Sequence, residues 1–448
     1  MQKLLPLFAL LTACAPAQTQ YSQEEVLEDI EYLQQQLEDY HPGFYRYTDK
    51  EEMVGYFLEA KQSPGLNDIG LYQRVNYLLS KIGCGHTRSR MSDAMRTKFE
   101  QNQRFLPLSV KFLGDKVCVR QSLHDQVPVG AQITAINRKS IEDIKQQIYQ
   151  YLPTDGVIET GKERRTELLF DAYYQMYIDT TATSYQLEMI DVNGEKLTAN
   201  LEGVSYEEMN AIRTSFSGNL LSLEHSEDYA YMRIRTFSNQ SLHGNGYDYE
   251  RFLAESFNEL KTKGTKNLIL DLRGNGGGKD DYGALLVSYL AKEPYGYFDR
   301  IEVTQNYPGN AKRIGENYHI TTHNGLSIWQ PSEDRFDGKV YVLIDGFSFS
   351  TCADVATVLH HHGWATFIGE ETGGGYDGNT NGHSKTITLP NSGITVNVPM
   401  WMYTTANVGH EYPARGVIPD YEIEQTWTEF SNGYDAVLEK AKELIEGE

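Results

Sequence analysis

The feature that most constrains the fold is an apolar run that ends in a cluster of glycines. Residues 268–278 read Leu-Ile-Leu-Asp-Leu-Arg-Gly-Asn-Gly-Gly-Gly. A short apolar run bounded by turn residues is typical of a strand buried on both faces, and glycines let the chain bend sharply after it. We expect a buried strand over 267–271 that opens onto a loop whose backbone N–H groups face a cavity. A dinucleotide site is the alternative, but the spacing of the glycines does not meet that fingerprint.

Strands and helices alternate from about residue 205 to the end of the chain. The pattern predicts strands over 228–235, 267–271 and 339–344, and helices over 247–263, 282–291, 353–362 and 434–445. Residues 391–393, Asn-Ser-Gly, predict a hairpin between strands 386–389 and 394–398. This alternation indicates an α/β core with largely buried strands.

The first half of the chain has a different texture. Ser22 and Glu25 form a capping-box pattern before apolar residues at helical spacing, so residues 21–95 predict a helical N-terminal domain. Strands are expected over 108–113 and 116–120, then a turn and a strand within 127–137, followed by a helix over 141–151. That order resembles the core of a PDZ domain, with a structural β-rich insert as the alternative. The expected division is 1–20, 21–95, 96–204 for the PDZ-like domain and 205–448 for the α/β core.

The N-terminus has the pattern of a secretion signal. Lys3 precedes the apolar run 4–11, which is too short to span a bilayer, and residues 11–14 read Leu-Thr-Ala-Cys. This resembles a bacterial lipoprotein signal, in which Cys14 becomes an acylated N-terminus; a plain signal peptide is the alternative. We expect a protein of the bacterial cell envelope, lipid-anchored to a membrane and facing the periplasm or the cell surface.

Composition limits the partners and cofactors. A formal net charge of −22 argues against nucleic acid as a partner. Cys84, Cys118 and Cys352 are widely spaced and predict small buried side chains rather than a disulfide or zinc site. Residues 360–362 are three histidines on a predicted helix, where consecutive side chains diverge, so the helix C-terminus explains them better than a metal. No cofactor is expected, and the oligomeric state is not predicted.

The turn that contains Ser350 is the candidate for a catalytic nucleophile. Residues 340–354 predict a strand, a tight turn and a helix start, which would expose the hydroxyl of Ser350 beside a helix N-terminus. An N-cap serine is the alternative for this residue.

Residues 205–425 resemble the tail-specific (C-terminal-processing) serine peptidases and the tricorn core peptidase. The resemblance rests on residues 271–278 and 348–353, with 368–372 and 411–420 in support. It implies a crotonase-like β/α spiral in the catalytic core, Ser350 as nucleophile, and an oxyanion hole from the N–H groups of Gly278 and Thr351. Ser348 is the nearest rival for the nucleophile.

The base is expected to be a histidine. The position where tail-specific enzymes place a lysine falls on Gly375. The tricorn-like branch instead takes its base from a Gly-His-Thr motif, which residues 85–87 match, so the resemblance implies His86 as base and Glu411 as its orienting group. Lys385 is the next candidate for the general base if His86 lies far from Ser350.

The expected function is that of a serine endopeptidase that cleaves peptides or proteins in the cell envelope through an acyl-enzyme. The alternatives are an inactive ligand- or peptide-binding protein on the same fold, and an esterase or amidase.

Overall fold

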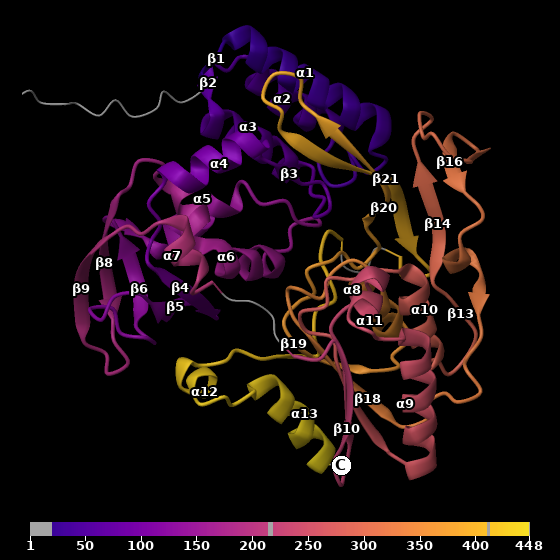
Figure 1. The fold of residues 1–448 in the computed structure, drawn as a ribbon. Helices are drawn as coiled ribbons and strands as arrows, with labels where there is room; N and C mark the ends of the chain where they lie inside the picture. Colours follow the sequence, from indigo (N-terminus) through magenta and orange to yellow (C-terminus); the bar gives the residue numbers. More distant parts are fainter. Residues whose placement is uncertain (1–19, 214–217, 410–412, 448) are drawn as a thin grey trace, which may run out of the picture.

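The computed structural model describes residues 20–213, 218–409 and 413–447, arranged around three six-stranded sheets (Figure 1). Cys14 and Glu411 lie outside the described residues. Within these ranges, no helix combines the length and apolar character that crossing a membrane requires.

The central sheet is almost entirely parallel. Its strand order is β10-β11-β12-β18-β19-β22, and only β10 runs antiparallel to its neighbour. The strands are β10 (Leu221–His225), β11 (Ala230–Ile234), β12 (Asn267–Asp271), β18 (Lys339–Ile344), β19 (Thr366–Gly369) and β22 (Tyr421–Glu422). The helices of this part of the chain are α8 (Asn239–Gly244), α9 (Tyr249–Lys263), α10 (Asp280–Ser288), α11 (Thr351–His361), α12 (Trp427–Ser431) and α13 (Ala436–Glu446).

Alternate residues of β12 face opposite helical layers. Leu268 and Leu270 pack in the large core that includes α9, α10 and α11, whereas Ile269 packs with Ala441 of α13. Both faces of the sheet are therefore covered, which explains why its strands are continuously apolar. The α/β class is confirmed, and β12 and β18 have the predicted bounds.

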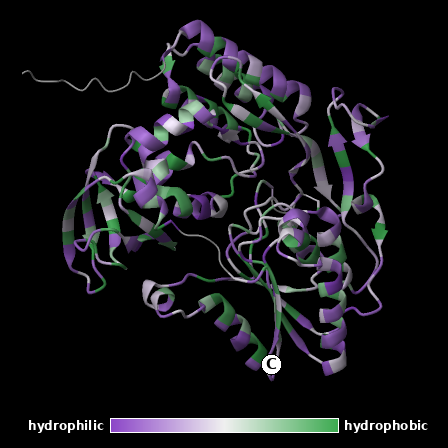
Figure 2. Ribbon diagram, in the orientation of Figure 1, coloured by the Kyte–Doolittle hydropathy of each residue, from purple (hydrophilic) through white to green (hydrophobic). Residues whose placement is uncertain are grey.

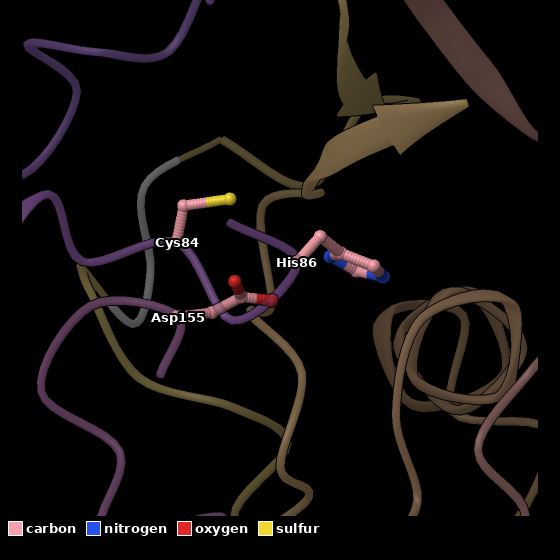
Figure 3. A group of neighbouring side chains, drawn as sticks. All are labelled: Cys84, His86 and Asp155. Atoms are coloured by element: carbon pink, nitrogen blue, oxygen red, sulfur yellow. The ribbon is translucent and has the colours of Figure 1, made fainter. Parts of the chain in front are cut away.

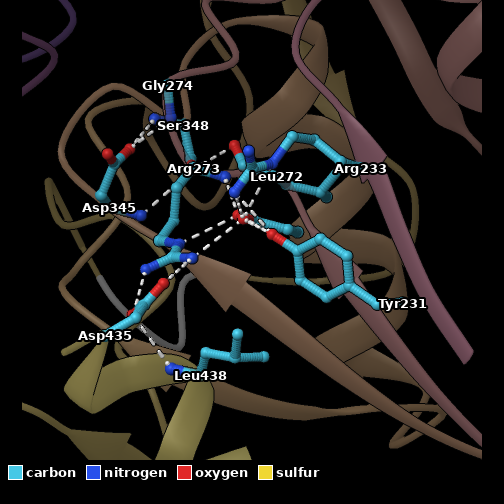
Figure 4. A network of polar contacts seen from close by, with 10 residues as sticks. Tyr231, Arg233, Leu272, Arg273, Gly274, Asp345, Ser348, Asp435 and Leu438 are labelled. Atoms are coloured by element: carbon cyan, nitrogen blue, oxygen red, sulfur yellow. Dashed lines mark hydrogen bonds and ion pairs between the residues drawn. The ribbon is translucent and has the colours of Figure 1, made fainter. Parts of the chain in front are cut away.

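A network of charges attaches α13 to the end of β12 (Figure 4). Arg273 donates to Asp271 at 2.9 Å and to Asp435, the N-cap of α13, at 2.7 and 2.8 Å. Arg233 and Tyr231 also donate to Asp271. These partners hold the pKa of the buried Asp271 carboxyl below its ordinary value. Asp271 therefore stays ionised in the interior beside the charged Arg273.

The second sheet is antiparallel and has the order β15-β16-β14-β21-β20, with β3 paired to β21. Its strands are β3 (Ser89–Arg90), β14 (Phe298–Val303), β15 (Lys312–Ile314), β16 (Asn317–Ile320), β20 (Thr380–Thr388) and β21 (Thr395–Thr405). The short strands β13 (Tyr295–Gly296) and β17 (Ile328–Trp329) pair separately, and a 3-10 turn spans Asn324–Leu326. The predicted hairpin is present as β20 and β21, with longer arms than the sequence indicated.

The N-terminal elements pack against the tip of this hairpin (Figure 1). They are β1 (Gln20–Tyr21), α1 (Gln23–Tyr40), α2 (Lys50–Lys61), β2 (Leu66–Asn67), α3 (Asp68–Lys81) and α4 (Asp93–Asn102). Ser22 and Glu25 form the predicted capping box. Ile387, Ile394 and Val396 of the hairpin complete the apolar core under these helices, so the C-terminal half of the chain contributes to the N-terminal core.

The third sheet, order β4-β5-β6-β8-β9 with β7 at β6, lies between these parts in sequence. The elements of this region are β4 (Leu108–Leu113), β5 (Lys116–Ser122), β6 (Gln132–Ile136), β7 (Lys139–Ser140), α5 (Ile141–Tyr149), α6 (Thr160–Tyr173), a π-helix (Tyr174–Ile178), β8 (Ser184–Ile190), β9 (Lys196–Glu202) and α7 (Tyr206–Asn210). The PDZ-like assignment of this region and the domain boundaries stay predictions. Figure 2 shows hydrophilic and hydrophobic residues interspersed along the outer helices, as expected for helices with one buried face.

Candidate active site

Ser350 lies at the junction between β18 and α11, in an unusual backbone conformation. Its φ is 58° and its ψ is −135°, and it is the N-cap of α11. Non-glycine residues rarely adopt a positive φ, and such residues concentrate at functional sites. Its Oγ accepts a hydrogen bond from Asn381 Nδ2 at 3.4 Å rather than capping the helix. The N-cap alternative therefore does not explain the orientation of this side chain.

Asp345 and Ser348 hold the turn that precedes Ser350. Asp345 Oδ1 accepts the N–H groups of Gly274, Phe347 and Ser348 at 2.9–3.1 Å. The Ser348 hydroxyl is fully buried, accepts the Asp345 N–H and donates to Leu272 O at 3.1 Å. The Ser348 hydroxyl is thus occupied by structural hydrogen bonds, whereas Ser350 lines a cavity.

The glycine loop after β12 lies directly against Ser350. A Cβ on Gly277 would lie 2.7 Å from Ser350 Cβ and 2.9 Å from Thr351 N, so only glycine fits there. Phe237 N–H donates to Gly277 O, and Lys279 N–H donates to Phe237 O. In this parallel pairing the intervening Gly278 N–H points away from Phe237.

The Gly278 carbonyl accepts the Thr351 hydroxyl at 3.2 Å, which places Gly278 beside the start of α11. Thr351 N–H is among the first N–H groups of that helix, which have no partner within the helix. The predicted oxyanion donors therefore lie close to each other and to Ser350.

His86 reaches the site from the loop between α3 and β3. Its ring stacks on Phe349, the residue before Ser350, with centroids 4.4 Å apart and planes 27° apart. Gly85 permits this approach, because a Cβ there would lie 2.9 Å from the Phe349 ring. Asn397 Nδ2 donates to His86 O at 3.1 Å and ties the loop to β21.

Ser350 and His86 line one cavity of about 840 Å³, a size suited to a ligand site. Its walls come from the loop after α3, from β3 and α6, from the glycine loop, from the turn before α11 and from the hairpin. The lining residues include His86, Arg88, Arg90, Arg165, Gly277, Gly278, Phe349, Ser350, Asn381 and Asn397.

The environment of His86 keeps its ring neutral. Burial, together with the positive charges of Arg88 and Arg165, lowers its pKa well below the ordinary value. A neutral imidazole can accept the proton of a serine hydroxyl.

Asp155 is the carboxylate beside His86, and no sequence motif pointed to it. It is almost fully buried, and one of its oxygens lies within 4.8 Å of a His86 ring nitrogen (Figure 3). Its Oδ1 accepts Gly85 N–H at 2.7 Å and its Oδ2 accepts Gly375 N–H at 3.4 Å. The position at which a lysine was expected therefore contributes a backbone donor to this carboxylate.

Cys84, His86 and Asp155 also form a cluster with the composition of a metal site. These side chains do not suit a metal ion. A metal binds the thiolate form of cysteine, and burial raises the pKa of the Cys84 thiol to about 11. The charge of Asp155 already interacts with Arg46 and Arg165. A hydrogen-bonded loop that holds His86 fits these residues better.

The remaining predicted residues are Lys385, the three cysteines and the histidines near the end of α11. Lys385 donates to Gln36 Oε1 at 2.8 Å, packs over Tyr40 and does not line the cavity. Cys84, Cys118 and Cys352 are buried free thiols, as predicted. His360 lies 3.0 Å from the Tyr376 hydroxyl and His362 stacks on Trp364, so the two rings have separate surroundings.

A serine with a positive φ at a helix start, a glycine loop and a neutral histidine line one cavity beside the α/β core. Residues 228–423 match the sequence profile of peptidase family S41, which identifies this part of the chain as a serine-type peptidase region.

Two crystal structures extend the likeness in fold to the rest of the chain. The structure of mature CPAF matches with a TM-score of 0.67 at 15% identity, over 94% of this chain and 96% of that chain. The structure of mature CPAF complexed with lactacystin matches with a TM-score of 0.67 at 16% identity, over 95% of this chain and 99% of that chain. At this identity the likeness shows the fold alone.

Proposed function

We propose that the protein is an endopeptidase in which Ser350 is the nucleophile and His86 is the general base. Ser350 Oγ attacks a peptide carbonyl, its proton passes to His86, and the N–H groups of Gly278 and Thr351 stabilise the oxyanion. His86 then protonates the leaving amine, and water releases the acyl group by the reverse transfer. The stacking of His86 on Phe349, next to Ser350, is the observation that carries this proposal.

Asp155 is the carboxylate that orients His86 in this Ser-His mechanism. An orienting carboxylate fixes the tautomer of the base and stabilises the imidazolium as it forms. A separation of up to 4.8 Å between oxygen and ring nitrogen suits a bridging water or a small closing movement when substrate binds.

We also propose that the mature chain is lipid-anchored in the cell envelope through Cys14. The support is the sequence pattern of residues 1–14 alone. Radiolabelled palmitate should enter the wild-type protein in bacterial cells and should not enter a Cys14→Ser variant; equal incorporation would contradict the anchor.

Cleavage of reduced, alkylated casein tests the catalytic proposal. Wild-type protein should release peptides, whereas Ser350→Ala and His86→Ala should lower the rate by about 10³-fold or more. Ser348→Ala is the matched control within the same turn, and it should retain catalysis in the fraction that folds. Equal rates for wild type and Ser350→Ala would contradict the proposal, and a wild-type protein without activity would favour the binding protein.

A further inference from the structure

The cavity beside Ser350 is strongly basic in a chain that is acidic overall. Arg88, Arg90 and Arg165 line it, and no Asp or Glu lies among its lining residues in the described ranges. The chain as a whole has a formal net charge of −22. A cluster of one sign in a cleft attracts ligands of the other sign.

Arg88 lies next to the nucleophile turn. Its guanidinium carbon is 5.6 Å from the centre of the Phe349 ring, and its Nε donates to Gly85 O at 2.6 Å. The Nε–H group of the guanidinium thus has a backbone acceptor, which fixes the Arg88 side chain. The two terminal nitrogens, Nη1 and Nη2, can donate to another acceptor.

Arg165 reaches the same cavity from α6. Its Nη1 donates to Pro153 O at 2.6 Å, and its Nη2 lies beside Gly161, which packs against Gly346 at the start of the nucleophile turn. Two arginines held by backbone carbonyls therefore lie on the side of the cavity that Ser350 occupies.

These two cations are close enough to repel each other. Desolvation, followed by the charge of Arg88, lowers the pKa of Arg165 to about 9. Among the described residues, neither side chain has a carboxylate within ion-pair distance. Asp155, whose charge acts on both arginines, already accepts the N–H groups of Gly85 and Gly375. A bound anion would relieve the repulsion and the desolvation together.

We propose that Arg88 and Arg165 form a subsite for a carboxylate group of the peptide substrate, so that the peptidase selects cleavage sites near a negative charge. The inference rests on the proposed role of Ser350. Guanidinium groups bind carboxylates through paired, charge-assisted hydrogen bonds, and the charge here lies within a few residues of the scissile bond. The carboxylate can belong to an Asp or Glu side chain or to a peptide C-terminus.

Three synthetic libraries of decapeptides distinguish these sources. The first contains Asp and Glu and ends in an amide; the second has Asn and Gln in their place and a free C-terminus; the third has neither kind of carboxylate. Wild-type protein should cleave the first or the second about tenfold faster than the third, the effect of one charge-assisted hydrogen bond. The faster library identifies the source of the carboxylate.

Arg88→Gln and Arg165→Gln should each bring that ratio close to one. Arg96→Gln is the matched control, because it removes the same charge from the surface of α4, where Arg96 pairs with Asp93 and does not line the cavity. It should keep the wild-type ratio. Circular dichroism on each variant shows whether it is folded.

A wild-type ratio near one, or a ratio unchanged in both cavity variants, would overturn the subsite while leaving the peptidase intact. If wild-type protein cleaves none of the libraries and does not react with a neutral fluorophosphonate, the proposed role of Ser350 fails instead.

Discussion

Gly277 shows how little space surrounds Ser350. Its φ is 90°, and an added Cβ would contact Ser350 Cβ, Phe349 O and Thr351 N at 2.7–2.9 Å. Its neighbour Gly276 has no atom within 4 Å of an added Cβ. Two adjacent glycines in one loop therefore have opposite tolerance for a side chain.

Gly277→Ala should lower the rate of casein cleavage by about 10²-fold or more, because the new methyl group displaces Ser350 or the oxyanion donors. Gly276→Ala should stay within about threefold of wild type, since its methyl group meets no atom. Equal rates for the two variants would contradict the packing described for this loop.

Asp155→Asn tests the proposal that this carboxylate orients His86. Asn keeps an acceptor for Gly85 N–H but lacks the charge that stabilises the imidazolium, so the rate of fluorophosphonate labelling should fall by about 10²-fold. Asp93→Asn, on the surface of α4, is the control and should label at the wild-type rate. An unchanged labelling rate in folded Asp155→Asn would show that another group, such as Glu411, orients the base.

The pH dependence of the rate should reflect the surroundings of His86. The base must be neutral to accept a proton, and its pKa lies well below 6.5. Activity should therefore persist as the pH falls below 6.5 and decline only at more acidic pH. A decline centred at or above pH 6.5 in the rate of labelling would contradict the burial of the ring.

At the scale of elements, His41 connects α1 to the loop that carries His86. It is the C-cap of α1, and its Nε2 lies 2.8 Å from the Thr87 hydroxyl. Burial lowers its pKa to about 4. Because this lies below the value near 6.5 in the unfolded chain, its neutral form favours the folded state fully above pH 6.5, and this contribution is lost as the pH falls toward 4.

The free energy of unfolding should therefore decrease between pH 7 and pH 4, by up to about 3 kcal/mol from His41 alone. Urea titrations at several pH values measure this, and His41→Gln should show a flatter dependence than wild type. The same slope in both proteins would contradict a buried, neutral His41.

Elements with a clear local pattern were predictable from the sequence. The strands over 267–271 and 339–344 were predicted with the observed bounds, because both are apolar and end at turn residues. The helix α6 and the strand β14 were not predicted. The apolar pattern of α6 is interrupted by charges that the fold places inside, such as Arg164 with Glu167 and Glu370.

The site was predictable only where its residues lie in motifs. Ser350, Gly278 and His86 belong to recognisable turns, whereas Asp155 is one acidic residue 70 positions from its partner Gly85. Only the tertiary fold brings these two segments together, so spacing along the chain carries no signal for the pair.

At the scale of the molecule, the active site depends on how its parts dock. His86 comes from the N-terminal elements, Asp155 and Arg165 from the region of the third sheet, and Ser350 from the α/β core. The hairpin of β20 and β21 joins these parts through the N-terminal core and through Asn381 and Asn397 at the site. Under the proposed mechanism, changes at the interfaces between these parts should therefore alter catalysis.

The ion pairs of Arg273 are a structural part of this assembly. Arg273→Ala should lower the free energy of unfolding by about 3–5 kcal/mol, because it leaves the buried Asp271 with weaker compensation and frees α13. Arg251→Ala, which removes an exposed pair with Glu255, should change it by no more than about 1 kcal/mol. Similar effects of the two changes in urea unfolding would contradict the role of the network.

The most direct test of the account is to locate the adduct of a fluorophosphonate on the folded protein. Mass spectrometry of the intact, labelled protein followed by peptide mapping should find one adduct, on Ser350, and none when His86 is replaced by alanine under the same exposure. An adduct on another residue, or labelling of Ser350→Ala at the wild-type rate, would contradict Ser350 as the nucleophile.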